Sequence, residues 1–200
     1  MQSEQQIELR HLTEAAAEIL AAVAESGSYC QVFSFWKLPS FGDQFRYTLY
    51  TPRRSASNLH PLLTTTTWQR NVDSEKLRDP VERLKHPRQL LPTILELSMV
   101  LGFEAVTDSI RVLEGIGIPS LRPSEQVIGL DGTQFRFAFS QGYYSLDVSW
   151  WADRPQSWQG FAGRIYELVS NLQNNGNQEA EQDETQQPPL AALSSTSPLI

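Results

Sequence analysis

Apolar residues recur along the first third of the chain with two different periods. Between Leu9 and Val23 they return every three or four residues, which is the spacing of an amphipathic helix. Residues 30–36 and 44–50 instead favour strands, the second because large apolar residues alternate there with polar ones. The threonine-rich stretch 62–70 suits a third strand. We therefore predict one helix followed by three strands.

Proline and glycine divide the middle of the chain into short segments. Asp79-Pro80 has the form of an N-cap followed by proline at the first helical position, and it predicts a short helix that Pro87 closes. Helices are also expected over residues 93–101 and 107–114, each of which is followed by a glycine. This region is thus predicted to be helical.

Two turn signals organise the last third. Asp131-Gly132 and Gln141-Gly142 each predict a two-residue hairpin loop, and together they predict a β-meander. This register opposes Phe139 and Tyr144, Phe137 and Leu146, Phe135 and Val148, Ile128 and Phe135, and Leu130 and Thr133. The large apolar residues then share one face, which is expected to include Trp150, and Arg136 lies opposite Asp147 on the other face.

A final amphipathic helix is expected to cover the apolar face of the meander. Asp153 and Pro155 open it, and its apolar stripe consists of Trp158, Phe161, Ala162, Ile165, Leu168, Val169 and Leu172. After Gln173 the chain becomes rich in asparagine, glutamine and glutamate, and then in proline and serine. Such a segment buries too little apolar surface to order itself, so residues 174–200 are predicted to be a disordered acidic and polar tail.

These elements predict an α+β fold in one domain over residues 5–173. The expected architecture is an antiparallel sheet with helices packed mainly on one face, ending in the C-terminal β-meander and the amphipathic helix. A two-lobed arrangement is the alternative, because residues 45–68 and 135–158 both combine an alternating strand, a tryptophan and a following helix.

Composition and charge narrow the class of protein. The 200 residues are 40% hydrophobic and carry a formal net charge of −7, an acidic balance that argues against nucleic-acid binding. The single cysteine, Cys30, allows no intramolecular disulfide, and its apolar surroundings predict a buried, inert thiol.

The acidic N-terminus lacks the positive region of a signal peptide, and the alanine-rich stretch 15–24 is too short to cross a bilayer. We expect a cytoplasmic protein without a membrane segment.

No motif assigns a chemistry to the chain. The three histidines, His11, His60 and His86, are too far apart for helical metal-ligand spacing, so no metal site is expected. Gly115-Ile116-Gly117 follows a predicted helix and fits a helix-terminating turn better than a dinucleotide loop. We expect no cofactor and no catalytic residue, and the interpretation leans away from an enzyme.

Basic residues concentrate between positions 53 and 88. Acidic residues are interspersed among them, so most of these charges are expected to lie on a solvated helical face. The alternative is an enzyme or ligand-binding domain for an anionic small molecule, held by Arg53, Arg54, Arg83, His86 and Arg88.

A second candidate surface is aromatic. If the apolar face of the meander is buried, Tyr143 and Trp151 point outward beside Arg136 and Asp147. Aromatic residues next to an arginine are typical of binding hot spots. The competing interpretation is that another segment, such as the first helix, covers this face, and the Arg136–Asp147 pair then needs no function beyond cross-strand stabilisation.

The end of the chain also carries a resemblance. Leu130-Asp131-Gly132-Thr133, an alternating strand, a tight turn, Ser149-Trp150-Trp151 and Pro155 to Trp158 before a helix resemble the ending of assorted uncharacterised bacterial proteins, some of them immunity-like. The resemblance covers residues 130–172 and implies an α+β domain without catalytic residues. The leading hypothesis is a non-enzymatic accessory, adaptor or immunity-type protein that binds an unidentified protein partner.

Overall fold

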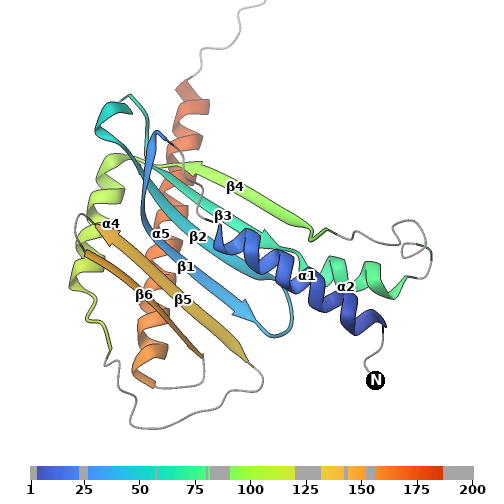
Figure 1. The fold of residues 1–200 in the computed structure, drawn as a ribbon. Helices are drawn as coiled ribbons and strands as arrows, with labels where there is room; N and C mark the ends of the chain where they lie inside the picture. Colours follow the sequence, from blue (N-terminus) through green and yellow to red (C-terminus); the bar gives the residue numbers. More distant parts are fainter. Residues whose placement is uncertain are drawn as a thin grey trace, which may run out of the picture.

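The computed structural model describes residues 4–22, 27–56, 58–79, 81, 91–119, 132–141, 144–151 and 156–186. Its elements in chain order are α1 (Glu4–Ala21), β1 (Tyr29–Pro39), β2 (Gln44–Pro52), the 3₁₀ turn η1 (Arg54–Ala56), β3 (Leu62–Trp68), α2 (Arg70–Arg78), β4 (Ile94–Val100), α4 (Phe103–Gly115), β5 (Thr133–Gln141), β6 (Tyr144–Trp151) and α5 (Gln156–Gln186). The strands form one antiparallel sheet in the order β4-β3-β2-β1-β5-β6 (Figure 1). The α+β class is confirmed.

The larger core lies between the sheet and helices α4 and α5. Strand alternation turns Phe33 and Phe35 of β1 and Phe137 of β5 toward these helices, and all three are buried. Phe137 stacks on Phe33 at 6.1 Å and meets Phe161 of α5 edge-on at 5.5 Å. Ile165 of α5 is fully buried, so the predicted stripe of the last helix does pack on the sheet. Burial of each such side chain contributes about 1.5–3 kcal/mol.

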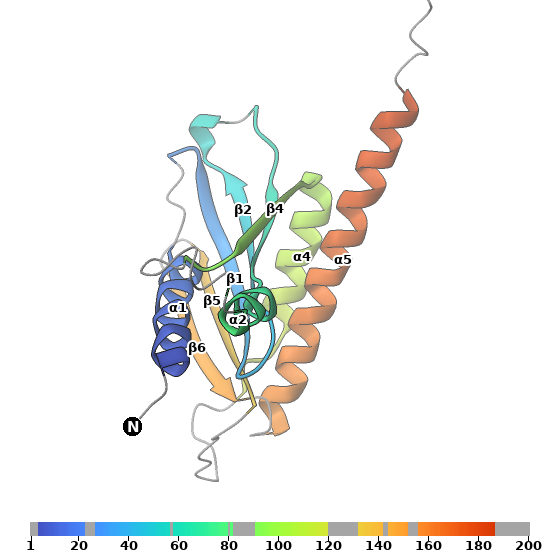
Figure 2. The ribbon, with the colours of Figure 1, turned by 90° about the vertical axis from the view of Figure 1, so that its right-hand side faces the viewer.

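Helix α1 covers part of the opposite side of the sheet (Figure 2). Its residues Leu12, Ala16 and Leu20 form a second core with Trp36 of β1 and Trp68 of β3. Helices α4 and α5 therefore share one side of the sheet, as expected for the main packing face, while α1 gives the other side its own cover.

Buried polar groups hold the end of α1 on the sheet. Arg46 of β2 lies beneath the helix and donates to the carbonyl oxygens of Leu20, at 2.9 Å, and of Ala22. The indole N–H of Trp36 also donates to Leu20 O, at 2.8 Å. The last carbonyls of a helix have no partners within it, and a cation stabilises that negative end. Arg46 and Trp36 thus act as a C-terminal cap supplied by the sheet.

The predicted register of the last hairpin is wrong by two residues. Strand β5 pairs Phe137 with Val148 and Phe139 with Leu146, and Arg136 lies opposite Ser149 rather than Asp147. The loop between the paired residues Gln141 and Tyr144 starts one position later than expected. Because side chains alternate with a period of two, this slip leaves every residue on its predicted face.

The outer strand of the expected meander is also corrected. Strand β1 pairs with β5 on the edge away from β6, for example Phe35 with Phe137. Both edges of β5 are therefore occupied, and the predicted pairing of Ile128 with Phe135 is wrong. Ile128 and Leu130 lie outside the described residues.

The middle of the chain departs most from the prediction. Residues 94–100 form strand β4 instead of a helix, while α2 occupies residues 70–78, just before the helix expected from Asp79. That expected helix falls mainly outside the described residues, and α4 confirms the one over 107–114. An apolar run of this length fits either a strand or a buried helix, and pairing with β3 decides for the strand.

Helix α5 continues past the predicted start of the tail at residue 174 and ends at Gln186. Leu172 is fully buried, and at Gly176 the helix lies so close to β4 that an added Cβ atom would meet the Met99 sulfur at 2.1 Å. The packing of α5 on β4 therefore continues one turn beyond Leu172, the last residue of the predicted apolar stripe. No described helix has both the length and the apolar composition required to cross a lipid bilayer.

Candidate functional site

The side of the sheet that faces α1 is only partly covered. Helix α1 lies over β1, β2 and β3, and Ala138 of β5 packs against the same core, but among the described elements none covers this side of β6 (Figures 1 and 2). The surface formed on this side by Arg136, Ser145, Asp147, Ser149 and Trp151 is named here the open face. The two serines and Asp147 are exposed, and Arg136 and Trp151 are half-buried.

On the open face, Arg136 contacts two neighbouring side chains. Its Nε and Nη2 atoms donate to the two oxygens of Asp147 at 2.9 and 2.5 Å. Its guanidinium carbon also lies 4.7 Å from the ring centroid of the buried Trp36. A bidentate carboxylate contact and a stacking contact together restrict the planar guanidinium in two directions. The side chain is thus fixed before any partner arrives.

The ion pair also perturbs both of its members. The hydrogen bonds from Arg136 hold the pKa of Asp147 below its ordinary value, and the same bonds raise the pKa of Arg136. Both side chains are more than a third exposed, at 38% for Arg136 and 53% for Asp147, so the pair is screened by solvent. Asp147 therefore stays ionised at neutral pH and serves to orient Arg136, not to exchange protons.

The structure brings together three of the four predicted residues of this surface. Arg136 and Asp147 are paired even though they are not directly opposite in the register, because the long arginine reaches diagonally across the strands. Trp151 lies on the same side, at the end of β6, while Tyr143 falls outside the described residues. Trp36, which holds Arg136 from below, was not foreseen.

The prediction that Tyr144 joins the core is wrong, since its side chain is exposed. Helix α5 starts at the opposite end of β6, where Trp158 packs on Trp150 at 4.9 Å. The Tyr144 end of the strand is therefore not covered by this helix.

The described part of the basic segment does not form a single patch. Arg53 and Arg54 are exposed between β2 and β3, and Arg53 Nε donates to Tyr29 O at 3.3 Å. Arg70 lies at the far end of β3, where it bonds Ser40 O and stacks on a tryptophan ring. Strand β3 has seven residues, which separates the two groups by about 23 Å. Arg83, His86 and Arg88 lie outside the described residues.

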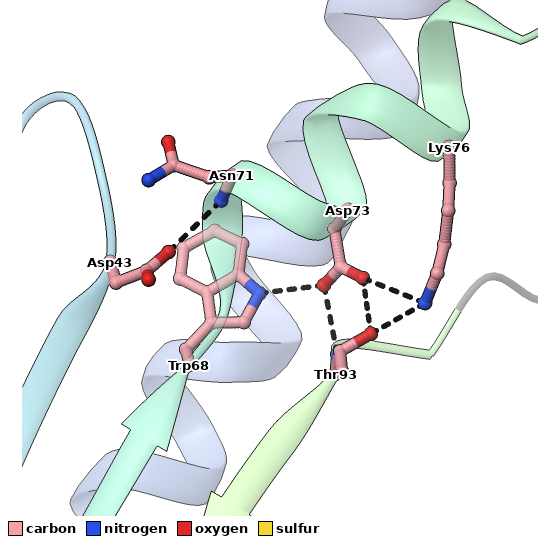
Figure 3. A network of polar contacts seen from close by, with 6 residues as sticks. All are labelled: Asp43, Trp68, Asn71, Asp73, Lys76 and Thr93. Carbon is pink, nitrogen blue, oxygen red and sulfur yellow. Dashed lines mark hydrogen bonds and ion pairs between the residues drawn. The ribbon is translucent and has the colours of Figure 1, made fainter.

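A buried carboxylate, Asp73, was missed altogether by sequence reasoning. It is 2% exposed and receives hydrogen bonds from Trp68 Nε1 and from the backbone N–H of Thr93, each at 2.8 Å (Figure 3). Its other oxygen binds the Thr93 hydroxyl and Lys76 Nζ, the latter at 3.3 Å. We call these four residues the Asp73 cluster. Both oxygens point at groups of the chain itself, so the cluster joins β3, α2 and the start of β4.

The start of α2 receives a further contact from the β1–β2 loop. Asp43 accepts the backbone N–H of Asn71 at 3.0 Å (Figure 3). Gln69, which precedes the helix, makes no capping bond with its own side chain. Asp43 therefore satisfies one of the free N–H groups at this helix end from a distant part of the chain.

Potential metal and nucleophilic groups are scattered over the described residues. His11 lies 3.8 Å from Glu14 on α1. His60 lies just before the start of β3, beside the ring of Phe103. Within the described ranges no three ligating side chains gather as a metal site would require. Cys30 is exposed near the start of β1, which corrects the expectation of a buried thiol, because its side chain points away from both cores.

A groove between α4 and α5 encloses a cavity of about 490 Å³. Two of its charged lining groups bind their own chain: Asp108 pairs with Arg111 at 3.0 Å, and Arg164 Nη2 donates to Gly117 O at 3.4 Å. Glu167, Asn171, Asn174 and Asn175 complete the polar lining of the groove. Comparisons of the chain with protein-family models, curated proteins and solved structures found no match.

Proposed function

We propose that this chain is a non-catalytic protein-binding domain, of an accessory, adaptor or immunity type, whose partner contacts the open face of β5 and β6. The observation that carries the proposal is Arg136, which is fixed by Asp147 and Trp36 yet remains accessible. Arginine and tryptophan are the residues that most often dominate binding energy at protein interfaces.

Prior ordering of Arg136 supports binding because association usually loses side-chain freedom. An immobilised long side chain costs about 0.5–1.5 kcal/mol on binding, and this cost has already been met during folding here. Asp147 uses the Nε and Nη2 atoms of the guanidinium, so Nη1 is not part of the bidentate contact and can donate to a partner's carboxylate or carbonyl oxygen.

The surroundings of Arg136 match the anatomy of an interface. Trp151 supplies a large aromatic surface at one end of β6, while Ser145 and Ser149 place small hydroxyl groups on the same side. An arginine and a tryptophan next to small polar groups have the composition of a binding hot spot. We further propose a cytoplasmic location, supported by a single, exposed cysteine that forms no internal disulfide.

Site-specific photo-crosslinking tests the proposal. A photoreactive phenylalanine analogue replaces the exposed Ser149 on the open face, which leaves the Arg136–Asp147 pair intact, or, as the control, the exposed Val112 on α4. In extract of the native host, one protein should be captured from position 149 and not from position 112. Excess unmodified chain should compete for this capture, whereas an Arg136→Ala/Trp151→Ala variant with an unchanged circular dichroism spectrum should not.

Equal capture at both positions would contradict the proposal, because it would show no preference for the open face. Equal competition by the Arg136→Ala/Trp151→Ala variant would also contradict it, since binding would then not depend on the residues that define this surface.

A further inference from the structure

Strand β4 is an edge strand with an unusually apolar surface. The side chains of Leu95, Leu97 and Val100 are 43%, 60% and 54% exposed. Glu96 is the single charged residue of the strand, and no proline or lysine interrupts it. Native proteins usually protect edge strands with such residues, because an open apolar edge pairs readily with another strand. The other edge strand, β6, carries Asp147 and two exposed serines instead.

The backbone of β4 offers a complete set of hydrogen-bonding groups on its free side. Leu101 N donates to Pro61 O and Gln69 N donates to Thr93 O, both at 2.9 Å. In an antiparallel ladder the bonded residues alternate, so the odd-numbered residues of β4 bond to β3. The N–H and C=O groups of the even-numbered residues, Ile94, Glu96, Ser98 and Val100, therefore point away from the sheet.

We propose that a second copy of this chain pairs with β4 in antiparallel orientation and forms one continuous sheet across two subunits. The two-fold axis passes beside Leu97, so that Leu97 meets its own copy. The even-numbered residues then form the hydrogen-bonded pairs: Ile94 with the partner's Val100, and Glu96 with the partner's Ser98.

The side chains of β4 select this register over its neighbours. Leu95 faces the partner's Met99 and Leu97 faces Leu97, so apolar residues meet on the side of α5. A shift of the pairing by two residues in one direction sets Glu96 opposite Glu96, and like charges directly opposite each other are destabilising. The opposite shift sets Glu96 against Val100 and leaves Ile94 without a partner inside the strand. The proposed register alone pairs all seven residues of the strand and separates the two glutamates.

Helix α5 continues past the edge strand. It crosses β4 where Gly176 approaches Met99, and it continues to Gln186, which corresponds to about 15 Å of helix. Figure 1 shows α5 passing beyond β4 at this point. In the proposed pairing Met99 is adjacent to the partner's Leu95, so the end of α5 is directed toward the partner's edge strand. Its residues 177–186 are mostly polar and acidic, and the exposed leucines are therefore covered by the facing strand of the second copy.

Measurement of mass in solution tests the pairing. Light scattering across a concentration series should show the native chain approaching twice its 22.6 kDa mass. Leu97→Lys should remain at the single-chain mass over the same range, whereas Val112→Lys, at a comparably exposed position on α4, should behave like the native chain. Circular dichroism of both variants establishes that the fold is retained. A native chain that stays at the single-chain mass, or a dimer unaffected by Leu97→Lys, overturns the proposal.

Disulfide trapping tests the register. In a Cys30→Ser background, Leu97→Cys should crosslink two chains on mild oxidation, because facing residues at a non-hydrogen-bonded site lie about 4.5 Å apart, within disulfide reach. Leu95→Cys alone should not, since its copy lies about 13 Å away along the strand, but Leu95→Cys together with Met99→Cys should. Efficient crosslinking by Leu95→Cys alone, or none by Leu97→Cys, rules out the proposed register.

Discussion

Replacement of Asp73 by alanine should destabilise the fold more than any other single polar change described above. The substitution removes the acceptor for the Trp68 indole N–H and the Thr93 backbone N–H. Trp68 is fully buried, so its donor finds no water in exchange. A buried donor left without a partner costs about 1–3 kcal/mol, and two such donors give about 2–6 kcal/mol.

Loss of the buried charge pair points to a similar magnitude. Removal of one member of a buried ion pair costs about 3–5 kcal/mol, but Lys76 is 40% exposed and can turn to solvent. The expected loss for Asp73→Ala is therefore about 3–5 kcal/mol, dominated by the two N–H groups. This is a large part of the 5–15 kcal/mol that stabilises a typical domain.

Two variants separate these contributions. Asp73→Asn retains one oxygen for the two N–H donors and loses the charge, so it should cost about 1–2 kcal/mol. Lys76→Ala removes only the exposed cation and should cost less than about 1 kcal/mol. Urea unfolding followed by tryptophan fluorescence and by far-ultraviolet circular dichroism measures all three, in a Leu97→Lys background that removes any effect of self-association. A loss for Asp73→Ala no larger than that for Lys76→Ala would refute the role assigned to the Asp73 cluster.

Three further predictions follow from the packing of the sheet and α5. Phe137→Ala, which removes a ring that contacts Phe33 of β1 and Phe161 of α5, should cost about 3–5 kcal/mol of unfolding free energy. Tyr144→Ala, at the exposed end of β6, should change the unfolding free energy by less than about 0.5 kcal/mol. Urea titration measures both losses, and a larger loss for Tyr144→Ala would contradict this packing. Gly163→Ala should raise the thermal midpoint, with a gain of about 0.5–1 kcal/mol, because the glycine is exposed within α5 and an added Cβ meets nothing within 4 Å; a lower midpoint would contradict this. Burial raises the pKa of Tyr47 and, together with the charge of Tyr47, the pKa of Tyr166. The folded state therefore holds these protons more tightly than the unfolded state, so the stability from the two neutral phenols is complete below the unfolded pKa of about 10 and is lost as the pH rises above it. Tyr47→Phe/Tyr166→Phe should flatten this alkaline decline in unfolding free energy, and an unchanged decline would show that other groups cause it.

The sequence predicts side-chain faces more reliably than it predicts partners. Alternation assigned Phe135, Phe137 and Arg136 to their correct faces, because a register error of two residues leaves a strand's faces unchanged. The turn residues located the last hairpin only to within one position, and that uncertainty was enough to change every facing pair. Strand β4 was misread as a helix because its apolar run fits both structures until β3 provides a partner.

The candidate site was predictable only as far as it is local. Arg136 and Asp147 share a face of one hairpin, and their contact follows from that hairpin. The contact of Arg136 with Trp36 depends on β1 lying beside β5, about a hundred residues later in the chain, and no short-range pattern contains that information. The Asp73 cluster was missed for the same reason, because Thr93 reaches Asp73 only once β4 has paired with β3.

Trp36 connects the stability of the fold to the open face. Its indole N–H donates to Leu20 at the end of α1, and its ring supports the guanidinium of Arg136. The last turn of α1 contains no basic residue of its own, so Arg46 from β2 supplies the positive charge at that helix end. Hydrogen bonds are directional, whereas apolar contact is not, and these bonds therefore set where α1 lies on the sheet. The groups that hold α1 over β1 to β3 thereby leave this side of β6 outside the cover of α1, and the same tryptophan keeps Arg136 in position on the open face.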